Sequence, residues 1–292
     1  MRFWWALAML CACAQPDPVR TETTATSSAS ASTDDADARA TLAFAVEGRS
    51  ARSITKQDLM QRIPVETLTV HDPYYNRKKT FRAVPLKRVL ELGFVGEKLD
   101  LAKQHFVLRA IDGYTVPIEG KKLLETGAYL AVADRDAPDW EPIGPQQANP
   151  GPFYMVWRGE KQLDTTEYPR PWQLARIEIS AFEKTFPHTV PARDDESAMR
   201  GFELFRSQCI RCHAINREGG RVGPDLNVPQ NVVEYRPEPQ IKSYIKNPLT
   251  FRYGNMPANP HLSEKDIGDL VAYLRSMSRL KHDPDGGKSA SH

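Results

Sequence analysis

The stretch Cys209-Ile210-Arg211-Cys212-His213 brings two thiols and an imidazole together within about one turn of chain. Two cysteines separated by two residues can form thioethers with the vinyl groups of a haem, and the histidine that follows can bind the iron from one face. The same pair occurs in redox dithiols and as half of zinc sites, but a zinc site needs two further Cys or His ligands at matching spacing, and no second pair appears. The motif therefore predicts one covalently attached haem, held by Cys209 and Cys212, with His213 as an iron ligand.

The residues before this motif follow the period of a helix, because Gly201, Phe205 and Cys209 recur at intervals of four. A second amphipathic helix is predicted near the end of the chain. It begins at a capping box formed by Ser263 and Asp266. Its apolar positions are Ile267, Leu270, Val271 and Leu274.

These two helices and the motif between them resemble class I cytochromes c over roughly residues 195–280. The resemblance implies an all-α domain in which Gly201 lets the first helix cross closely over the last one, where Tyr273 meets it. It also implies a role for Gly223-Pro224-Asp225-Leu226, which is similar to the G-P-x-L loop of the family. There the proline carbonyl accepts a hydrogen bond from the proximal histidine and fixes its ring, so Pro224 is expected to orient His213.

The sixth iron ligand implied by the resemblance is Met256, which lies in Tyr253-Gly-Asn-Met-Pro257, where the family places a methionine before a proline. A methionine in a loop between Gly and Pro has little core to fill. The alternatives are His261 or an open sixth position. With both axial positions filled, the iron exchanges electrons without making bonds to a substrate, so we expect electron transfer and no catalytic residues.

Composition sets limits on size and partners. The 292 residues exceed one typical domain and suggest two folded units. With 39 Lys and Arg against 37 Asp and Glu, the charge is nearly balanced, so we expect no nucleic acid as a partner. Arg211, Arg217 and Arg221 lie near the motif, but steering of an acidic partner by a few cations is generic, and the redox partner protein is not identified by them.

The first residues are typical of an exported protein. Arg2 precedes an apolar stretch that is too short to span a bilayer, and Leu10-Cys11-Ala12-Cys13 resembles a bacterial lipobox, which implies that Cys13 receives lipid. The alternative is an ordinary signal peptide. The following Ser, Thr, Ala and Asp residues cannot bury enough surface to order themselves, so they are predicted to form a flexible tether to a membrane, with the protein in the periplasm.

The middle of the chain alternates short strand patterns with turns and is predicted to be α+β and rich in sheet. Asp112-Gly113 is a strong signal for a two-residue hairpin turn. A short helix is predicted over Pro85–Leu92, stopped by Gly93. The predicted strands cover 106–111, 114–118, 128–133, 153–157 and 176–180.

The order of four pieces of this region resembles the molybdopterin-binding domain of sulfite oxidase-like enzymes. The pieces are Ala83–Leu90, Ile111-Asp-Gly-Tyr114, a Gly-Pro strand at Gly151–Trp157, and Trp172–Ile179. In that family a cysteine ahead of the first piece binds molybdenum, whereas the matching stretch here is Val70-His-Asp-Pro-Tyr-Tyr75, which lacks the ligand. We therefore expect no molybdenum catalysis and no bound molybdopterin, although the resemblance leaves a pocket for pterin or another small molecule.

Several charged residues of the middle region could have either a functional or a solvated role. His71 and Asp72 together would suit proton transfer, but Asp-Pro commonly opens a turn, so both are expected to be solvated. The run Arg77-Lys78-Lys79 is expected to be solvated rather than a specific anion site, and Asp134 with its neighbours Arg135, Asp136 and Asp139 is expected on the surface. The segment Pro138–Pro152 is expected to wrap the sheet.

The sequence thus predicts a sheet-rich α+β domain followed by an all-α cytochrome c-type domain. Its function is predicted to be electron transfer by a mono-haem cytochrome tethered in the periplasm. The alternatives are a fused oxidoreductase, whose middle domain binds a cofactor and oxidises a small substrate with the haem as electron acceptor, and a haem sensor with a vacant sixth position. The predicted divisions are a signal with lipobox (1–13), a disordered linker (14–40), the α+β domain (41–190), the cytochrome c domain (195–282) and a disordered tail (283–292).

Overall fold

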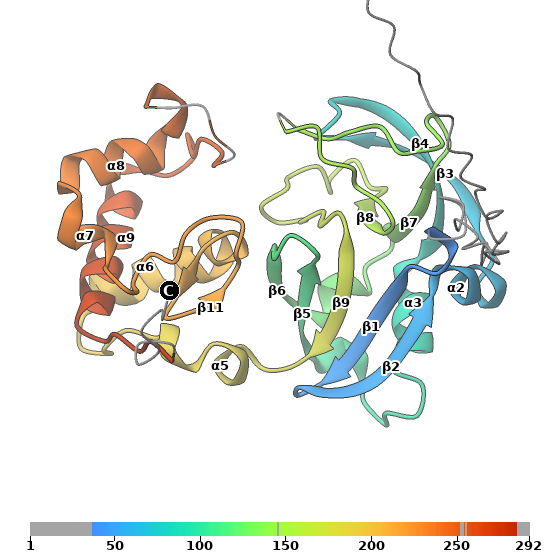
Figure 1. Ribbon diagram of the computed structural model, residues 1–292, viewed down its shortest axis with the longest axis horizontal. Coiled ribbons are helices and arrows are strands. Elements are labelled where there is room, and N and C mark those ends of the chain that lie inside the picture. The colour runs from blue at the N-terminus through green and yellow to red at the C-terminus, as the bar shows by residue number, and fades with distance from the viewer. Residues whose placement is uncertain (1–36, 145, 252–253, 255, 285–292) are drawn as a thin grey trace, which may run out of the picture.

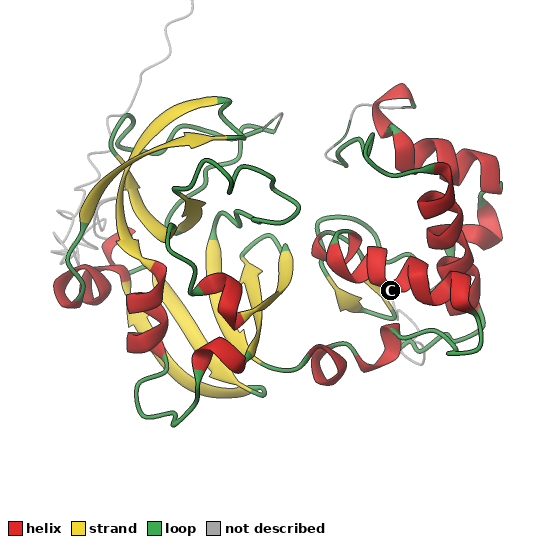
Figure 2. Cartoon of the chain, turned by 180° about the vertical axis from the view of Figure 1, so that it is seen from behind, coloured by secondary structure: helices red, strands yellow, loops and turns green. Residues whose placement is uncertain are grey.

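The computed structural model describes residues 37–284, except for residues 145, 252–253 and 255. A sheet-rich part is followed by a helical part (Figure 1), so the predicted fold class is confirmed. Figure 2 shows the same division from behind, with nearly all long helices in the C-terminal part. The predicted signal with Cys13, most of the linker and most of the tail lie outside the described residues. Asp283 is described and forms an ion pair with Arg217 at 3.4 Å.

Two sheets form the first part, which we call the sheet region (residues 41–185). A five-stranded sheet has the order β2-β1-β9-β5-β6, and a four-stranded sheet has the order β3-β4-β7-β8. β1 and β9 pair in parallel, while the other neighbours pair antiparallel. The strands are β1 (Thr41–Val46), β2 (Arg49–Thr55), β3 (Glu66–Asp72), β4 (Arg77–Pro85), β5 (His105–Ala110), β6 (Thr115–Glu119), β7 (Ala128–Asp134), β8 (Tyr154–Trp157) and β9 (Leu174–Ile179).

One apolar core joins the two sheets, because its buried residues include Phe44 of β1 and Leu130 of β7. The helix α3 (Leu86–Gly93) packs one face onto this core, and Gly93 leaves the space that the Phe44 ring fills. A second cluster covers the other face of the four-stranded sheet with Trp140 and Ile143, so Pro138–Pro152 wraps the sheet as expected. The remaining short helices are α2 (Lys56–Arg62), η1 (Leu101–Lys103), α4 (Gly120–Leu123), α5 (Phe182–Thr185) and η2 (Pro187–Thr189).

The predicted hairpin around Asp112-Gly113 is present, but the turn is longer than two residues. β5 ends at Ala110 and β6 begins at Thr115. The pair of the ladder that lies next to the turn is Arg109 with Thr115. Ile111 leaves the ladder, and its N–H donates to Gln173 O at 3.0 Å. That bond ties the hairpin turn to the loop before β9.

Three charged side chains that were expected in solvent are buried instead. Lys79 is fully buried and its Nζ lies 2.8 Å from a carboxylate oxygen of Asp134 and 2.8 Å from one of Glu141. Asp72, at the end of β3, is fully buried as well, whereas His71 is exposed as expected. The solvated readings of Lys79, Asp134 and Asp72 were wrong because burial of a charge depends on partners that are remote in sequence.

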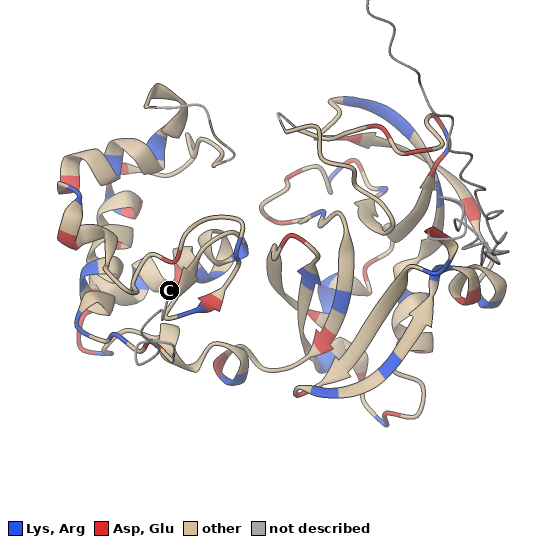
Figure 3. Cartoon of the chain, viewed as in Figure 1, with Lys and Arg blue, Asp and Glu red and all other residues tan. Residues whose placement is uncertain are grey.

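The helical part contains two long helices, α6 (Glu196–Ser207) and α9 (Glu264–Ser278), which pack against each other. The capping box predicted from Ser263 and Asp266 begins α9. Acidic and basic residues are interspersed over both parts of the molecule (Figure 3). The shorter elements are η3 (Cys209–Arg211), β10 (Ala214–Ile215), β11 (Glu218–Gly219), α7 (Val232–Tyr235), α8 (Glu238–Lys246) and η4 (Pro248–Thr250).

The crossing of α6 over α9 depends on Gly201, as predicted. A Cβ at this position would lie 2.0 Å from Asp269 O and 2.8 Å from the Cβ of Tyr273. The side chain of Asp269 accepts hydrogen bonds from Ser197 and, at 2.9 Å, from Nε of Arg200. The close backbone approach at Gly201 and the ion pair between Arg200 and Asp269 therefore fix the point at which α6 crosses α9.

Gly201→Val is expected to destabilise the folded protein by about 3 kcal/mol, because overpacking forces backbones apart. The matched control is Gly268→Ala on α9, where an added Cβ meets no atom within 4 Å. That change should stabilise the helix by ~0.5–1 kcal/mol. Urea unfolding followed by circular dichroism gives both free energies, and equal stabilities of the two variants would show that the crossing tolerates a side chain.

Candidate functional site

The thiols and imidazole of the C-x-x-C-H motif lie on a single turn that follows α6. The backbone N–H of Cys212 donates to Cys209 O at 3.1 Å, and that of His213 donates to the same oxygen at 2.9 Å. This folding is local, since α6 ends at Ser207 and η3 continues directly from it. The structure thus brings the three predicted attachment residues together within one turn.

The two cysteines are free thiols, and each is half-buried. Burial raises the pKa of the Cys209 thiol to about 12 and that of the Cys212 thiol to about 11. A reactive dithiol requires the opposite shift, because the thiolate is its nucleophile. Among the residues that the structure describes, no group of three or more His, Cys, Asp and Glu side chains forms a site for a metal ion.

His213 is held by the loop that follows it. Its Nδ1 donates to the carbonyl of Pro224 at 2.9 Å, which leaves Nε2 free to bind a metal. Gly223 lies against the ring, because a Cβ there would be 2.4 Å from Cε1 of His213. Burial lowers the pKa of His213, so the imidazole is neutral at pH 7, as iron binding requires. The hydrogen bond expected for Pro224 is thus present, while ligation of iron by His213 stays a prediction.

A buried chain of three asparagines supports this loop. The side-chain amide of Asn227 donates to Oδ1 of Asn216 at 2.7 Å, and that of Asn231 donates to Oδ1 of Asn227 at 2.6 Å. Asn231 also donates to Leu274 O of α9 at 2.9 Å. Sequence reasoning missed these residues, because asparagine in a loop usually signals a turn and their spacing carries no further signal.

Met256 is half-buried, in the segment between η4 and α9. Past it, the chain is pinned to α8, since Asn259 N donates to Lys246 O at 3.0 Å. The alternative ligand His261 is exposed, and its Nε2 lies 2.8 Å from Oε1 of Gln208, next to Cys209. Ligation of iron by Met256 rather than His261 remains a prediction.

The donor set fits a c-type haem: two adjacent thiols for the vinyl groups and a neutral imidazole with Nε2 free. When bound, this group supplies a one-electron couple at iron. The carbonyl of Pro224 orients the histidine ring. The loop that carries Pro224 is supported by the asparagine chain, which is bonded to Leu274 of α9.

In the sheet region, Asp72 at the end of β3 belongs to a buried polar cluster. Oδ2 of Asp72 accepts from the hydroxyl of Tyr154 at 2.8 Å, and Oδ1 accepts from Tyr74 N at 2.9 Å. Nη1 of Arg170 lies 3.7 Å from Asp72. Burial raises the pKa of Tyr154 well above its usual value, so the phenol stays a hydrogen-bond donor. Asp72, Tyr154 and Arg170 are thus brought together inside the sheet region.

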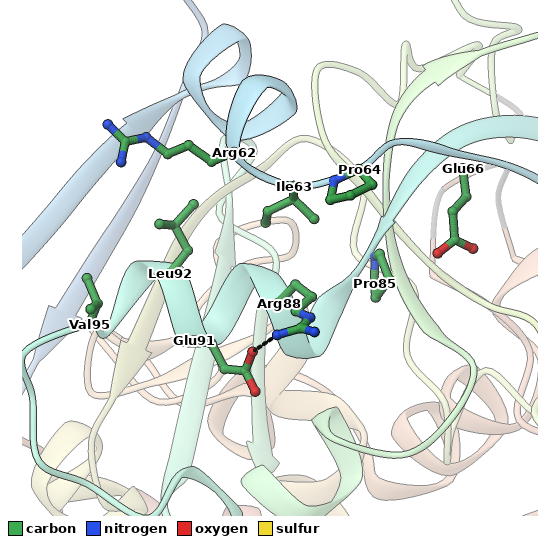
Figure 4. Close-up of a pocket in the computed structure, with 9 residues that line it drawn as sticks. All are labelled: Arg62, Ile63, Pro64, Glu66, Pro85, Arg88, Glu91, Leu92 and Val95. Carbon is green, nitrogen blue, oxygen red and sulfur yellow. Dashed lines mark hydrogen bonds and ion pairs between the residues drawn. The ribbon is translucent and has the colours of Figure 1, made fainter.

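A cavity of about 460 Å³ lies elsewhere in the sheet region, between the end of α2 and α3 (Figure 4). Its charged side chains include Arg88 and Glu91, which pair at 3.2 Å. No residue predicted to act in the function lines it.

None of the helices among the described residues has the length and apolar character needed to cross a bilayer.

Comparison with known proteins agrees with the geometry of the attachment turn. Residues 196–274 match the family model described as cytochrome c oxidase, cbb3-type, subunit III. The chain is 32% identical over 116 residues to cytochrome c oxidase subunit 2 of Alkalihalophilus pseudofirmus, which covers 37% of this chain and 34% of that protein. It is 26% identical over 100 residues to cytochrome c of Gibberella zeae, which covers 27% of this chain and 93% of that protein. The chain therefore spans about a third of the first relative.

The helical part is a cytochrome c domain, since the family match, the attachment turn and the helix crossing agree. Such a domain binds haem c and transfers electrons.

Proposed function

We propose that this chain is a mono-haem electron carrier, in which Cys209 and Cys212 hold the haem and His213 and Met256 bind its iron. The observation that carries the proposal is the hydrogen bond from His213 to the Pro224 carbonyl, because it presents Nε2 from the same turn that holds both thiols. With a methionine as sixth ligand, the iron takes up and releases electrons and makes no bond to a substrate.

The test is the metal content of protein purified from its native host, measured as iron and molybdenum per chain, with haem retention after denaturation. We expect about one iron per chain, haem that stays attached in denaturant, and no molybdenum. Absence of iron would overturn the proposal. Molybdenum in equal amount to the chain would instead make the sheet region a cofactor-binding oxidoreductase domain.

For the sheet region we propose a docking and stabilising role without molybdopterin. Its support is the cluster around Asp72, whose carboxylate accepts from Tyr154 and lies 3.7 Å from Arg170, where the sulfite oxidase-like resemblance requires a thiolate. Oxidation of a small substrate in this region remains the alternative, and the molybdenum measurement separates the two.

We further propose that the carrier works in the periplasm, anchored by lipid on Cys13, and exchanges electrons with redox partner proteins. The support is the lipobox-like run before Cys13 and the polar tether that follows it. A lipid anchor with a tether would hold the cytochrome domain near a membrane and let it reach its partners.

A further inference from the structure

The haem-attachment turn is bound by the sheet region through Arg211, the residue between the two cysteines. Its Nη1 donates to Thr165 O at 3.0 Å and its Nη2 donates to Thr166 O at 2.5 Å. The Nε of Arg211 is also buried, without a hydrogen-bond partner among the described residues. A charged guanidinium with its head group on two carbonyls of a remote loop is a specific contact, because hydrogen bonds to charged groups are the stronger ones.

A second contact lies beside the first. The backbone N–H of Arg221 donates to Gly113 O at 3.1 Å, in the turn between β5 and β6. The chains approach so closely that a Cβ on Gly113 would lie 2.7 Å from the Cβ of Arg221. Gly113 has φ +88°, so glycine serves both the turn and the approach.

Apolar side chains also pack between the sheet region and the cytochrome domain. Val107 of β5 belongs to the same buried cluster as Phe182 of α5 and Phe202 and Phe205 of α6. The two loops of the sheet region that meet the turn are tied to each other, since Ile111 N donates to Gln173 O. The loop that carries Thr165 is fixed by the indole N–H of Trp157, which donates to Pro169 O at 2.9 Å. The sheet region thus presents a preformed surface to the attachment turn.

We propose that the sheet region is a built-in docking partner that covers the haem-attachment turn and closes this surface to other proteins. The guanidinium of Arg211, which would otherwise offer positive charge to an acidic partner, is taken up by contacts within the chain. External redox proteins then approach another surface of the cytochrome domain. The docking itself does not depend on haem, whereas its effect on electron exchange rests on the proposed function.

The experiment opens the interface from each side in the full chain. Gly113→Asn adds a Cβ against Arg221 while keeping a residue that tolerates positive φ. Its control is Gly96→Asn, where φ is +96° and a Cβ meets no atom within 4 Å. Arg211→Gln removes the guanidinium from the cytochrome side, with Arg217→Gln as its control, since Arg217 pairs with Asp283 instead.

Hydrogen–deuterium exchange of residues 209–223 should become on the order of tenfold faster in Gly113→Asn and Arg211→Gln, because local opening sets exchange. The radius of gyration from small-angle scattering should increase. Oxidation of the haem by ferricyanide should also be on the order of tenfold faster, since an opened interface exposes the attachment turn to the oxidant. The control variants should match the natural sequence in all three measurements.

Unchanged exchange and radius of gyration in both interface variants would overturn the docking. Faster exchange with an unchanged ferricyanide rate would overturn the shielding of the haem. If the protein carries no haem, the proposed function fails, but exchange and scattering still decide whether the sheet region is docked. Should Gly113→Asn fail to fold, Arg211→Gln tests the same interface from the other side.

Discussion

Protein with Cys209→Ala and Cys212→Ala is expected to lose essentially all of its haem to acidified acetone, whereas the natural sequence keeps its haem on the polypeptide. The reason is covalent: each thioether needs one of these sulfurs, and His213 alone leaves the haem held only by coordination and packing. Either single variant should retain a haem with one saturated and one free vinyl group, and therefore a red-shifted pyridine haemochrome spectrum. Gel staining for haem peroxidase activity and that spectrum measure the effect.

The matched control is Ser207→Ala, two residues before the motif, where the hydroxyl donates to Leu204 O. This variant should keep its haem fully attached. Covalent haem that persists in the double cysteine variant would mean that attachment does not use the C-x-x-C-H motif. Loss of haem from the Ser207 control as well would indicate failure of folding rather than loss of the thioethers.

Met256→Ala is expected to lower the reduction potential by roughly 0.2 V, within the ~0.8 V range that axial ligands span. Thioether sulfur favours ferrous iron, so its loss favours the ferric form. The weak charge-transfer absorption near the red end of the ferric spectrum should disappear, and a redox titration gives the shift in potential. A vacated sixth position should also let carbon monoxide bind the ferrous haem.

His261→Ala separates Met256 from the competing ligand. The ring of His261 is exposed and bonded to Gln208, so its removal should leave spectrum and potential unchanged. A spectrum that changes in His261→Ala but not in Met256→Ala would reassign the sixth ligand to the histidine. A spectrum that changes in neither would favour an open position, and with it the haem sensor.

The cytochrome domain could be predicted far into its detail because its signals are local or short-range. The attachment turn is five residues long, and the capping box of Ser263 and Asp266 depends on a spacing of three. Even the distant contact of Gly201 with Tyr273 followed from a resemblance whose motifs lie in a fixed order. The asparagine chain behind the loop was missed, since each member looks like a turn residue.

The sheet region was predicted less well, and its buried charges show why. Lys79 lies in a run of basic residues, and its burial depends on Asp134 and Glu141, which are 55 and 62 residues away in the chain. Strands β1 to β4 were missed as individual elements, although β3 alternates exposed and buried residues in the way that marks a strand with one solvated face. The contact of Arg211 with Thr165 and Thr166 could not be predicted from the sequence, because its acceptors are backbone carbonyls, which every residue has.

The parallel pairing of β1 with β9 has a consequence for the order of assembly. β9 lies between β1 and β5 and is the last strand of its sheet to be synthesised, so the middle of that sheet stays open until Ile179 has emerged. Pairings over such separations form slowly, whereas the helices of the cytochrome domain meet over a shorter stretch of chain. The haem-attachment turn is therefore synthesised after the last strand that the sheet needs, and its docking surface forms only once both ends of the sheet region have met.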